Sequence, residues 1–296
     1  MREIDRILCP LDLSSVSCHA AEHAILIARW YKARITAQHV CNPVVIPASD
    51  FAVAGFGPPP VLTEDEIRDV RAQVAACFDS AKDVEVDVLV EGGRPAKQIL
   101  ERARSLPADL VVIGTHGAGG FEHLVLGSVT DKVLRQAACP VLTVPPHART
   151  TAKLPFKRLL CPVDFSDSSA AALVLAFSLA QEGDAALTIL HVLESPDESL
   201  TTRPITVPEY WQIREIEARS KLNALVPEFT RDWCRANARL ARGQAYREIL
   251  GTAAEDNADL IVMGVQGRNA LDLMLFGSTT NQVVRRATCP VLTLRR

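Results

Sequence analysis

The stretch ADLVVIGTHGAGGFEHLVLGSVTDKVLRQAACPVLTV, residues 108–144, decides the fold class of this chain. It opens with an apolar run typical of a buried strand and continues with a loop that holds five glycines between positions 114 and 128. A segment with helical apolar spacing and a second apolar run follow. Strand, loop, helix and strand in this order indicate a parallel sheet covered by helices. Ordering glycine costs more conformational entropy than ordering any other residue. Five glycines in one loop therefore indicate that the loop has a specific structural or functional role.

The whole pattern occurs twice along the chain, which indicates a duplicated domain rather than a short structural repeat. We expect a first domain at 1–146, a polar, proline-bounded linker at 147–156 and a second domain at 157–296. The repeated segments are ILCPLDLSS at 7–15 and LLCPVDFSD at 159–167, ITAQHV at 35–40 and LTILHV at 187–192, ADLVVIGTHG at 108–117 and ADLIVMGVQG at 258–267, and CPVLTV at 139–144 and CPVLTL at 289–294.

Each copy alternates strands with helices, so the predicted fold class is α/β. We expect two tandem doubly wound, Rossmann-like domains, each with a parallel sheet and helices on both faces. Thr63 and Glu66 have the spacing of a capping box and predict a helix start after a long loop at 42–62. The last strand of each copy is apolar and nearly uncharged. Since an unpaired edge of that kind invites association, we expect the two copies to pair through these strands.

Composition limits the classes of function. The chain has 296 residues, 48% apolar residues and a net charge of -3, which argues against nucleic acid as a partner. Its longest apolar stretch, 170–180, is too short to span a membrane and predicts a helix buried on most sides. Eight cysteines without a C-x-x-C motif, and an N-terminus without a signal-peptide pattern, predict reduced thiols and a cytoplasmic location.

Two features lie at the carboxyl ends of predicted strands, where open α/β sheets bind ligands. One is the acid that closes the first strand, Asp12 and Asp164. The other is a Gly-x-x-Gly-x9-Gly-Ser loop, whose last glycine and serine open a helix. Glycine allows close backbone approach, and free N–H groups at a helix start bind phosphate. An ionised Asp accepts hydrogen bonds from a base or a ribose.

Other interpretations of the same residues remain open at this point. Ser128 with Asp131 also has the spacing of an ordinary capping box, and Ser278 would then cap its own helix. The glycines would then serve only as tight turns. No G-x-x-x-x-G-K-[ST] motif occurs, so the chain is not a P-loop NTPase.

Together these motifs resemble the universal stress protein family in its tandem two-domain form. The resemblance is carried by the CPxD opening, the HV strand end, ADLxVxG, the glycine loop and the closing CPVLT. It implies five parallel strands per domain in the order 3-2-1-4-5. It also implies the branch that binds ATP, with Mg²⁺ as the accompanying cation, and it allows a homodimer.

The resemblance implies one nucleotide site per copy. In the first copy Asp12 and the backbone of Val40 would contact adenine, with Pro10 and Leu11 flanking it. Gly114 and Gly117 would line the ribose and phosphates, while Gly127, Ser128 and Val129 would hold phosphate. The matching residues of the second copy are Pro162, Val163, Asp164, Val192, Gly264, Gly267, Gly277, Ser278 and Thr279.

The two sites differ in detail. Ala118 stands where a basic residue often follows the second glycine, whereas the second copy keeps Arg268. His116 and Gln266 also differ, so the sites need not be equivalent.

Two further signals carry less weight. HAAEH at 19–23 fits an H-x-x-E-H zinc pattern, but the second copy has Ala171, Val174 and Leu175 at the matching places. We interpret this segment as a surface helix without a metal. The four cysteines before prolines, at 9, 139, 161 and 289, are expected to be buried and inert.

The leading hypothesis is a stress-response protein that binds ATP in each domain and acts as a nucleotide-dependent regulator or sensor. No catalytic residue is assigned, and at most weak ATP hydrolysis is expected, since neither a positioned base nor an arginine finger is evident. One alternative is a slow ATPase or phosphoryl-transfer enzyme with Ser14, Ser128, Ser166 or Ser278 accepting phosphate. Another is a scaffold protein without nucleotide.

Overall fold

The computed structural model describes residues 4–41, 63–116, 126–146, 148, 155–194, 207–226, 235–265 and 277–295. The first copy contains β1 (Arg6–Leu11), α1 (Ser15–Tyr31), β2 (Arg34–Cys41), α3 (Glu64–Ala76), β3 (Val86–Gly92), α4 (Pro95–Ser105), β4 (Leu110–Gly114), α5 (Ser128–Gln136) and β5 (Val141–Val144). The second contains β6 (Arg158–Pro162), α6 (Asp167–Gly183), β7 (Ala186–Leu193), α7 (Val207–Ala224), β8 (Arg235–Arg242), α8 (Ala245–Glu255), β9 (Leu260–Gly264), α9 (Ser278–Arg286) and β10 (Val291–Leu294).

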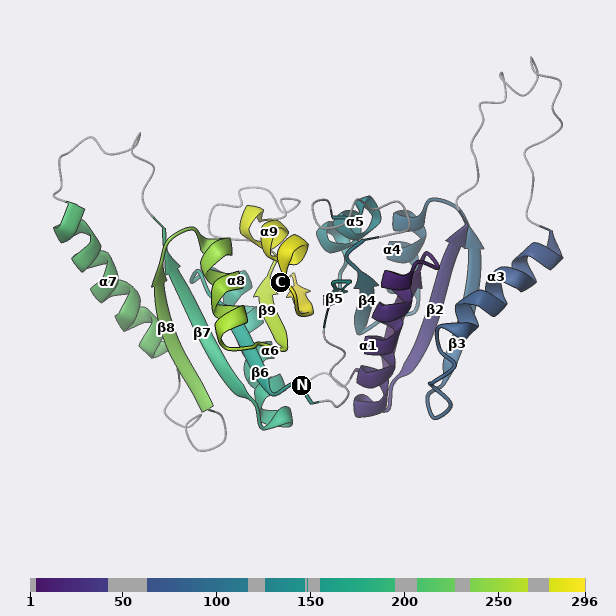
Figure 1. Cartoon of the computed structure of the whole chain (residues 1–296), viewed down its shortest axis with the longest axis horizontal. Helices are drawn as coiled ribbons and strands as arrows, with labels where there is room; N and C mark the ends of the chain where they lie inside the picture. Colours follow the sequence, from purple (N-terminus) through teal and green to yellow (C-terminus); the bar gives the residue numbers. More distant parts are fainter. Residues whose placement is uncertain are drawn as a thin grey trace, which may run out of the picture.

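All strands belong to one ten-stranded sheet in the order β3-β2-β1-β4-β5-β10-β9-β6-β7-β8. Within each copy the strands are parallel and follow the predicted 3-2-1-4-5 order. The prediction of two separate five-stranded sheets is wrong, because β5 and β10 pair antiparallel and make the sheet continuous and mixed. Figure 1 shows the two halves arranged side by side around this central pair.

The pairing of β5 with β10 confirms the predicted association of the two last strands. Val291 lies opposite Thr143, and Thr293 lies opposite Val141. Each threonine hydroxyl also donates to a carbonyl of the other strand, Thr143 to Val291 at 3.1 Å and Thr293 to Val141 at 3.2 Å. The hydrogen bonds between β5 and β10 therefore replace those that these buried hydroxyls would make to water in the unfolded chain.

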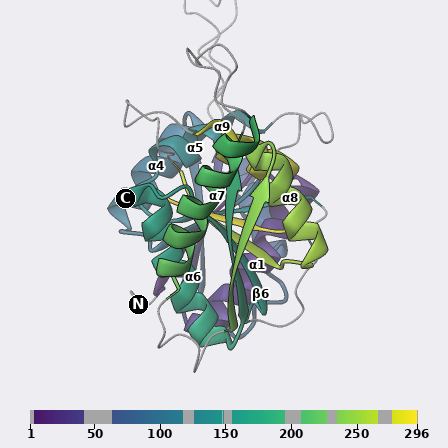
Figure 2. The ribbon, with the colours of Figure 1, turned by 90° about the vertical axis from the view of Figure 1, so that its left-hand side faces the viewer.

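Two apolar layers sandwich the sheet, and each runs through both halves. One layer contains α1 and α6 and is joined by residues of α3 and α7, while the other contains residues of α4, α5, α8 and α9. Figure 2 shows α6 and α7 on one side of the strands of the second copy and α8 on the other. The inner strands β1, β4, β5, β6, β9 and β10 are buried on both faces, which explains their continuous apolar runs. The edge strands β3 and β8 are half-buried or exposed along their length.

Several local predictions are tested by this structure. The Thr63–Glu66 capping box is confirmed, with Glu66 N to Thr63 Oγ1 at 3.2 Å and Thr63 N to Glu66 Oε2 at 2.8 Å. The apolar stretch at 170–180 lies within α6 as predicted. Most of this stretch is buried or half-buried, in agreement with the expectation, and Val174 is exposed at 71%. The predicted loop at 42–62 lies outside the described residues.

The cysteines follow the prediction only in part. Cys9, Cys161 and Cys289 are buried, and burial raises the pKa of the Cys9 and Cys289 thiols to about 12. The expectation of uniformly reduced thiols is wrong, because Cys18 of α1 and Cys77, which follows α3, form a disulfide with Cα atoms 5.2 Å apart. This bond ties the two helices of one face together.

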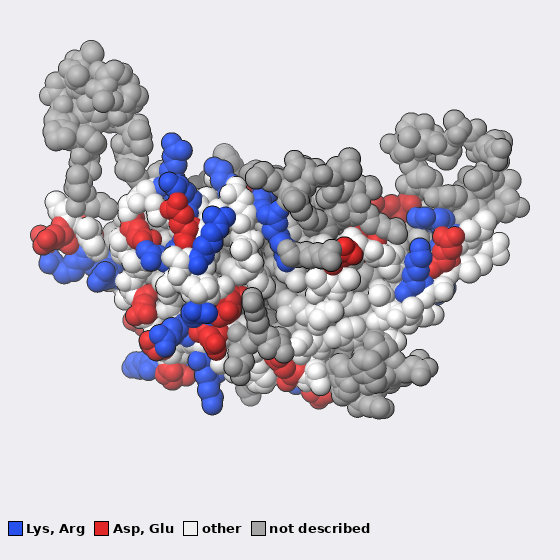
Figure 3. All heavy atoms as spheres, turned by 180° about the vertical axis from the view of Figure 1, so that it is seen from behind, with Lys and Arg blue, Asp and Glu red and all other residues white. Residues whose placement is uncertain are grey.

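No helix of the described segments is both long and apolar enough to cross a membrane. On the face shown in Figure 3, acidic and basic side chains are interspersed and do not separate into surfaces of one sign. This distribution agrees with the small net charge of the sequence.

Candidate functional site

The candidate site of each copy lies at the carboxyl edge of the sheet, at the point where the strand order reverses. β1 pairs in parallel with both β2 and β4, so the carboxyl ends of these three strands meet at one edge. Asp12 follows β1, and α5 begins at Ser128 on the same edge. In the second copy β6 has the same two neighbours, with Asp164 following β6 and α9 beginning at Ser278. Figure 1 shows α5 and α9 at this edge.

The aspartate of the first copy is held by the start of the next helix. Asp12 Oδ1 accepts hydrogen bonds from the Ser14 backbone N–H at 3.1 Å and from its hydroxyl at 2.6 Å. Ser14 is the N-cap of α1 and accepts from Ser17 N at 3.2 Å. Leu13 between them has a φ of 66°, a left-handed conformation that is strained for leucine. This turn fixes an exposed carboxylate beside the helix.

The second copy repeats this turn. Asp164 Oδ1 accepts from the Ser166 backbone N–H at 3.0 Å and from its hydroxyl at 2.5 Å. Phe165 takes the left-handed conformation with a φ of 63°. Because Asp164 is half-buried whereas Asp12 is exposed, the two carboxylates differ in their access to solvent. Ser14 and Ser166, considered as phosphate acceptors from the sequence, are both helix caps.

A histidine supports each aspartate from the neighbouring strand. His39 Nδ1 donates to the carbonyl of Leu11 at 2.9 Å, and His191 Nδ1 donates to the carbonyl of Val163 at 2.7 Å. In both copies the acceptor immediately precedes the aspartate. The repeated HV dipeptide contained this signal, but the sequence analysis gave the histidine no role.

The glycine loop begins and ends with a matched set of hydrogen bonds. In the first copy Gly127 N donates to Thr115 O at 2.9 Å, and Thr130 Oγ1 donates to Gly114 O at 2.8 Å. In the second copy Gly277 N donates to Val265 O at 2.9 Å. These bonds hold the start of α5 and of α9 against the end of the preceding strand. The intervening segments 117–125 and 266–276 lie outside the described residues, and with them Gly117 and Gly267.

The helix after the loop starts without a side-chain cap. Gly127 and Gly277 are the N-caps of α5 and α9, and neither helix has a capping side-chain hydrogen bond. The alternative in which Ser128 caps its helix with Asp131 is wrong, because Ser128 is already the first helical residue and Asp131 binds Arg135 at 2.8 Å. Among the described residues no side chain caps the first-turn amides, which leaves them as hydrogen-bond donors for a ligand.

The first glycine of the loop has a packing role that the sequence did not reveal. A Cβ on Gly114 would lie 3.1 Å from Val16 Cγ1, and a Cβ on Gly264 would lie 2.8 Å from the backbone carbonyl carbon of Ser168. A side chain at Gly264 would force the strand end away from the first turn of α6, whereas one at Gly114 would require only a small shift of Val16 in α1. The packing of each glycine on the helix that follows the aspartate places the start of the glycine loop near that aspartate, with no ligand involved.

The remaining predicted residues belong to the strands themselves. Val40 lies one position beyond the pairing of His39 with Leu11, at the carboxyl end of β2. Val192 lies near the end of β7, opposite Ala241. The side chains of the residues before each aspartate are buried, which leaves the backbone as their means of reaching a ligand: Pro10, Leu11, Pro162 and Val163. Val129 and Thr279 are half-buried second residues of their helices.

The histidine pair of α1 takes part in packing. His19 contacts Glu22 at 3.0 Å and the carbonyl of Ala148 in the linker at 2.9 Å. His23 is buried, and its Nδ1 donates to the carbonyl of His19 at 3.1 Å. The helix therefore lies at the surface on the side of the exposed Glu22 and packs inward on the side of His23, as expected for a crossover helix of which one edge lies on the sheet. The described residues contain no group of three or more metal-binding side chains.

Comparison with known proteins identifies the family. A profile of the universal stress protein family matches residues 3–145 and again residues 155–295. The chain belongs to the universal stress protein family. Its two family domains correspond to the two copies of the sequence and to the two halves of the sheet, and the family name connects the chain with the stress response.

Individual relatives agree with this assignment. A universal stress protein of Mycolicibacterium smegmatis is 28% identical over 299 residues, covering 98% of this chain and 96% of the relative. One from Methanocaldococcus jannaschii is 35% identical over 140 residues, covering 47% of this chain and 81% of the relative. The crystal structure of an Archaeoglobus fulgidus universal stress protein aligns with a TM-score of 0.64 at 22% identity, covering 99% and 97% of the two chains. That likeness shows the fold.

Proposed function

We propose that each half of this universal stress protein binds ATP with Mg²⁺, and that the chain acts in the cytoplasm as a nucleotide-dependent regulator or sensor. The observation that carries the proposal is the pairing, in both copies, of an aspartate with an uncapped helix start at the same edge of the sheet. A carboxylate accepts hydrogen bonds, and helix-start amides donate them to anions. An adenine nucleotide carries donors at one end and phosphates at the other.

In each copy, the aspartate and the helix start would contact different parts of the nucleotide. Asp12, held by Ser14, would accept a hydrogen bond from the adenine amino group or from a ribose hydroxyl. The amides of Ser128 and Val129 would donate to phosphate oxygens, helped by the positive end of the α5 dipole. Asp164, Ser278 and Thr279 would do the same in the second copy.

The donor set fits a cation that arrives with the nucleotide. Mg²⁺ prefers oxygen ligands and retains several waters, and it is commonly held by phosphates with one or two protein oxygens. Ser128 and Ser278 offer a hydroxyl at the helix start, and both residues are exposed. No group of metal-binding side chains lies among the described residues. The phosphates would therefore supply most of the Mg²⁺ ligands other than water. This arrangement provides binding without a general base, and we expect at most weak hydrolysis.

Calorimetry with MgATP tests the proposal. The wild-type chain is expected to bind two nucleotides, and the double variant Asp12→Ala with Asp164→Ala is expected to bind at least about tenfold more weakly, the loss of one hydrogen bond to a charged group. Asp79→Ala provides a control, because Asp79 is exposed and lies after α3, away from both sites. Equal affinity in all three proteins would contradict the assignment.

A second pair of variants tests the phosphate end separately. Gly127 and Gly277 both have a φ of -56° and a ψ of 136°, which alanine adopts without strain. Gly127→Ala with Gly277→Ala therefore adds a methyl group beside the first-turn amides without straining the backbone. We expect weaker MgATP binding with adenosine binding retained. Unchanged binding of both ligands would place the phosphates elsewhere.

A further inference from the structure

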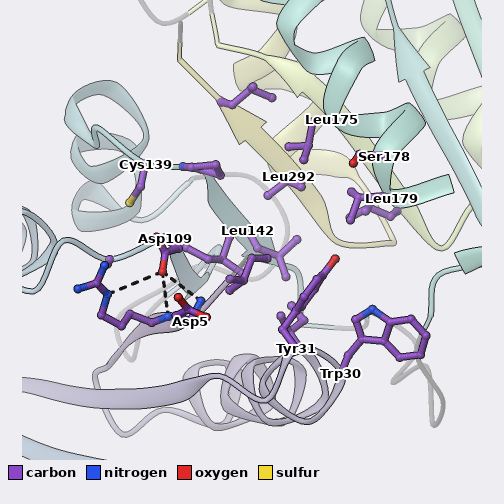
Figure 4. Close-up of a pocket in the computed structure, with 18 of the residues that line it drawn as sticks. Asp5, Trp30, Tyr31, Asp109, Cys139, Leu142, Leu175, Ser178, Leu179 and Leu292 are labelled. Carbon is purple, nitrogen blue, oxygen red and sulfur yellow. Dashed lines mark hydrogen bonds and ion pairs between the residues drawn. The ribbon is translucent and has the colours of Figure 1, made fainter. Parts of the chain in front are cut away.

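A cavity lies between the two copies, at the edge of the sheet opposite the candidate nucleotide sites. Its volume is about 1050 Å³. Residues at the start of β1, the end of α1 and the segment before β5 line it from the first copy, and α6 and β10 line it from the second. Figure 4 shows the side chains that converge on it from both copies. A volume of this size is typical of small-molecule sites.

The middle of this inter-copy cavity is apolar. Leu142 of β5 and Leu292 of β10 reach it from the central strands, and Leu175 and Leu179 reach it from α6. The Tyr31 ring faces them from α1, and Trp30 lies at the margin with 41% of its surface exposed. These walls suit a molecule with a large apolar body.

The α6 wall differs from its counterpart in the first copy. Ala171, Val174 and Leu175 line the cavity at the positions where α1 has His19, Glu22 and His23. In α1 those polar residues bind one another and the linker carbonyl of Ala148. The second copy therefore has an apolar wall where the first has a polar one, and it leaves Val174 71% exposed beside the cavity.

The charged groups around the cavity largely have partners. Asp109 accepts from the backbone N–H groups of Asp5 and Arg6 at 3.1 and 3.0 Å, and its carboxylate lies 3.8 Å from the Arg6 guanidinium. Glu182 accepts from the Tyr31 hydroxyl at 2.6 Å. Asp5 and Arg104 add one charge of each sign. The lining therefore offers no excess of unpaired charge to recognise an ion.

One polar group within the walls is available for a ligand. Ser178 of α6 lines the cavity between Leu175 and Leu179, and its hydroxyl has no hydrogen-bond partner among the described residues. A hydroxyl can both donate and accept, so it suits an alcohol or a carbonyl.

We propose that this cavity binds an uncharged lipophilic molecule with a hydroxyl or carbonyl group, which hydrogen-bonds to Ser178. The site is made by the joining of the two copies and is separate from both candidate nucleotide sites, so it does not depend on nucleotide binding. Because residues of both copies line the cavity, a single copy of the domain would not form it.

The test is a fluorescence titration in the full chain. Replacing Trp211 and Trp233 by phenylalanine leaves Trp30, of the three tryptophans, as the reporter at the cavity margin. Dodecan-1-ol is the probe, and dodecanoate and dodecylammonium are its charged counterparts. We expect saturable binding of one dodecanol per chain, at least tenfold tighter than either ion. Equal or tighter binding of an ion would overturn the proposal.

Variants connect the binding with the cavity. Ser178→Phe fills the space and should abolish dodecanol binding, whereas Ile216→Phe on the exposed surface of α7, outside the lining, should leave it unchanged. Ser178→Ala keeps the space and removes the hydroxyl, so it should weaken binding about fivefold even if the phenylalanine variant fails to fold. Unweakened dodecanol binding in Ser178→Ala would overturn the proposal. A dimer of the wild-type chain that Val174→Asp dissociates would also overturn it, because a second copy of the chain would then occupy the cavity.

Discussion

The hydroxyl of Thr130 donates to the backbone carbonyl of Gly114 across 2.8 Å, and this bond joins the first turn of α5 to the end of β4. The second copy has the same bond, from Thr280 to Gly264 at 3.0 Å. Both threonines are buried. The threonine hydroxyl inside the helix, together with the bond from Gly127 N to Thr115 O, therefore fixes the start of α5 against the end of β4.

Thr130→Val is expected to loosen this junction. Valine has nearly the shape of threonine but leaves the Gly114 carbonyl without its partner, which should lower the free energy of unfolding by about 1–3 kcal/mol. Urea denaturation measures the change, and hydrogen exchange should become faster at the amides of Gly127 and Asp131, which donate to the carbonyls of Thr115 and Gly127. Thr115→Val serves as the control, since its hydroxyl bonds to the His116 ring at 2.8 Å and not to the Gly114 carbonyl. Unaltered exchange in Thr130→Val would contradict the role given to this bond.

Gly264→Ala is expected to destabilise the second copy. The added methyl would lie 2.8 Å from backbone atoms of Ser168, so the strand end and α6 would have to separate, at a cost of about 1–3 kcal/mol. Gly251→Ala is the matched control, because Gly251 is exposed in α8 and its added methyl meets nothing within 4 Å. There alanine should stabilise the helix by about 1 kcal/mol. Thermal unfolding of both variants should therefore show shifts in opposite directions.

Much of the fold could be predicted because the signals are local or repeated. The apolar runs at 139–144 and 289–294 carry no charge, and they became the central antiparallel pair. The helix start at Thr63 was predicted because a capping box involves residues only three positions apart.

Features that depend on distant contacts were not predictable. Gly114 and Gly264 were assigned to ligand contact, whereas the structure shows that their nearest constraint is the helix they pack against. Cys18 and Cys77 are separated by 59 residues, and no spacing rule joins them. The left-handed conformation of Leu13 had no sequence signal either, because leucine rarely adopts it.

Removal of the Cys18–Cys77 disulfide is expected to destabilise the first half. The bond closes a long segment of chain, and such cross-links contribute about 2–4 kcal/mol, chiefly by restricting the unfolded state. Cys18→Ser with Cys77→Ser should therefore unfold at a lower urea concentration than wild type, and a reductant should lower wild type to the level of the variant. Cys41→Ser, at a half-buried free cysteine, is the control. A variant that still responds to reductant would show that another thiol pair is involved.

His23→Leu is expected to stabilise the chain and to reduce its sensitivity to acid. His23 is 2% exposed, and its Nε2 has no hydrogen-bond partner among the described residues. Burial lowers the pKa of its imidazole below the usual value of 6.5, against smaller opposing effects of the His19 carbonyl and Glu22. Above pH 6.5 the imidazole is neutral whether the chain is folded or unfolded. As the pH falls below 6.5, the unfolded chain takes up a proton that the folded chain resists, so stability is lost.

Leucine at this position removes both the unpaired nitrogen and the titration, and the second copy already has Leu175 there. We expect a gain of about 1 kcal/mol at pH 7 and a larger one at pH 5. Urea unfolding at both pH values, in wild type and variant, measures the difference. His39→Asn is the comparison, because its backbone hydrogen bond to Leu11 places it in a different environment. If wild type and His23→Leu lost stability in parallel from pH 7 to 5, the acid sensitivity would come from other groups.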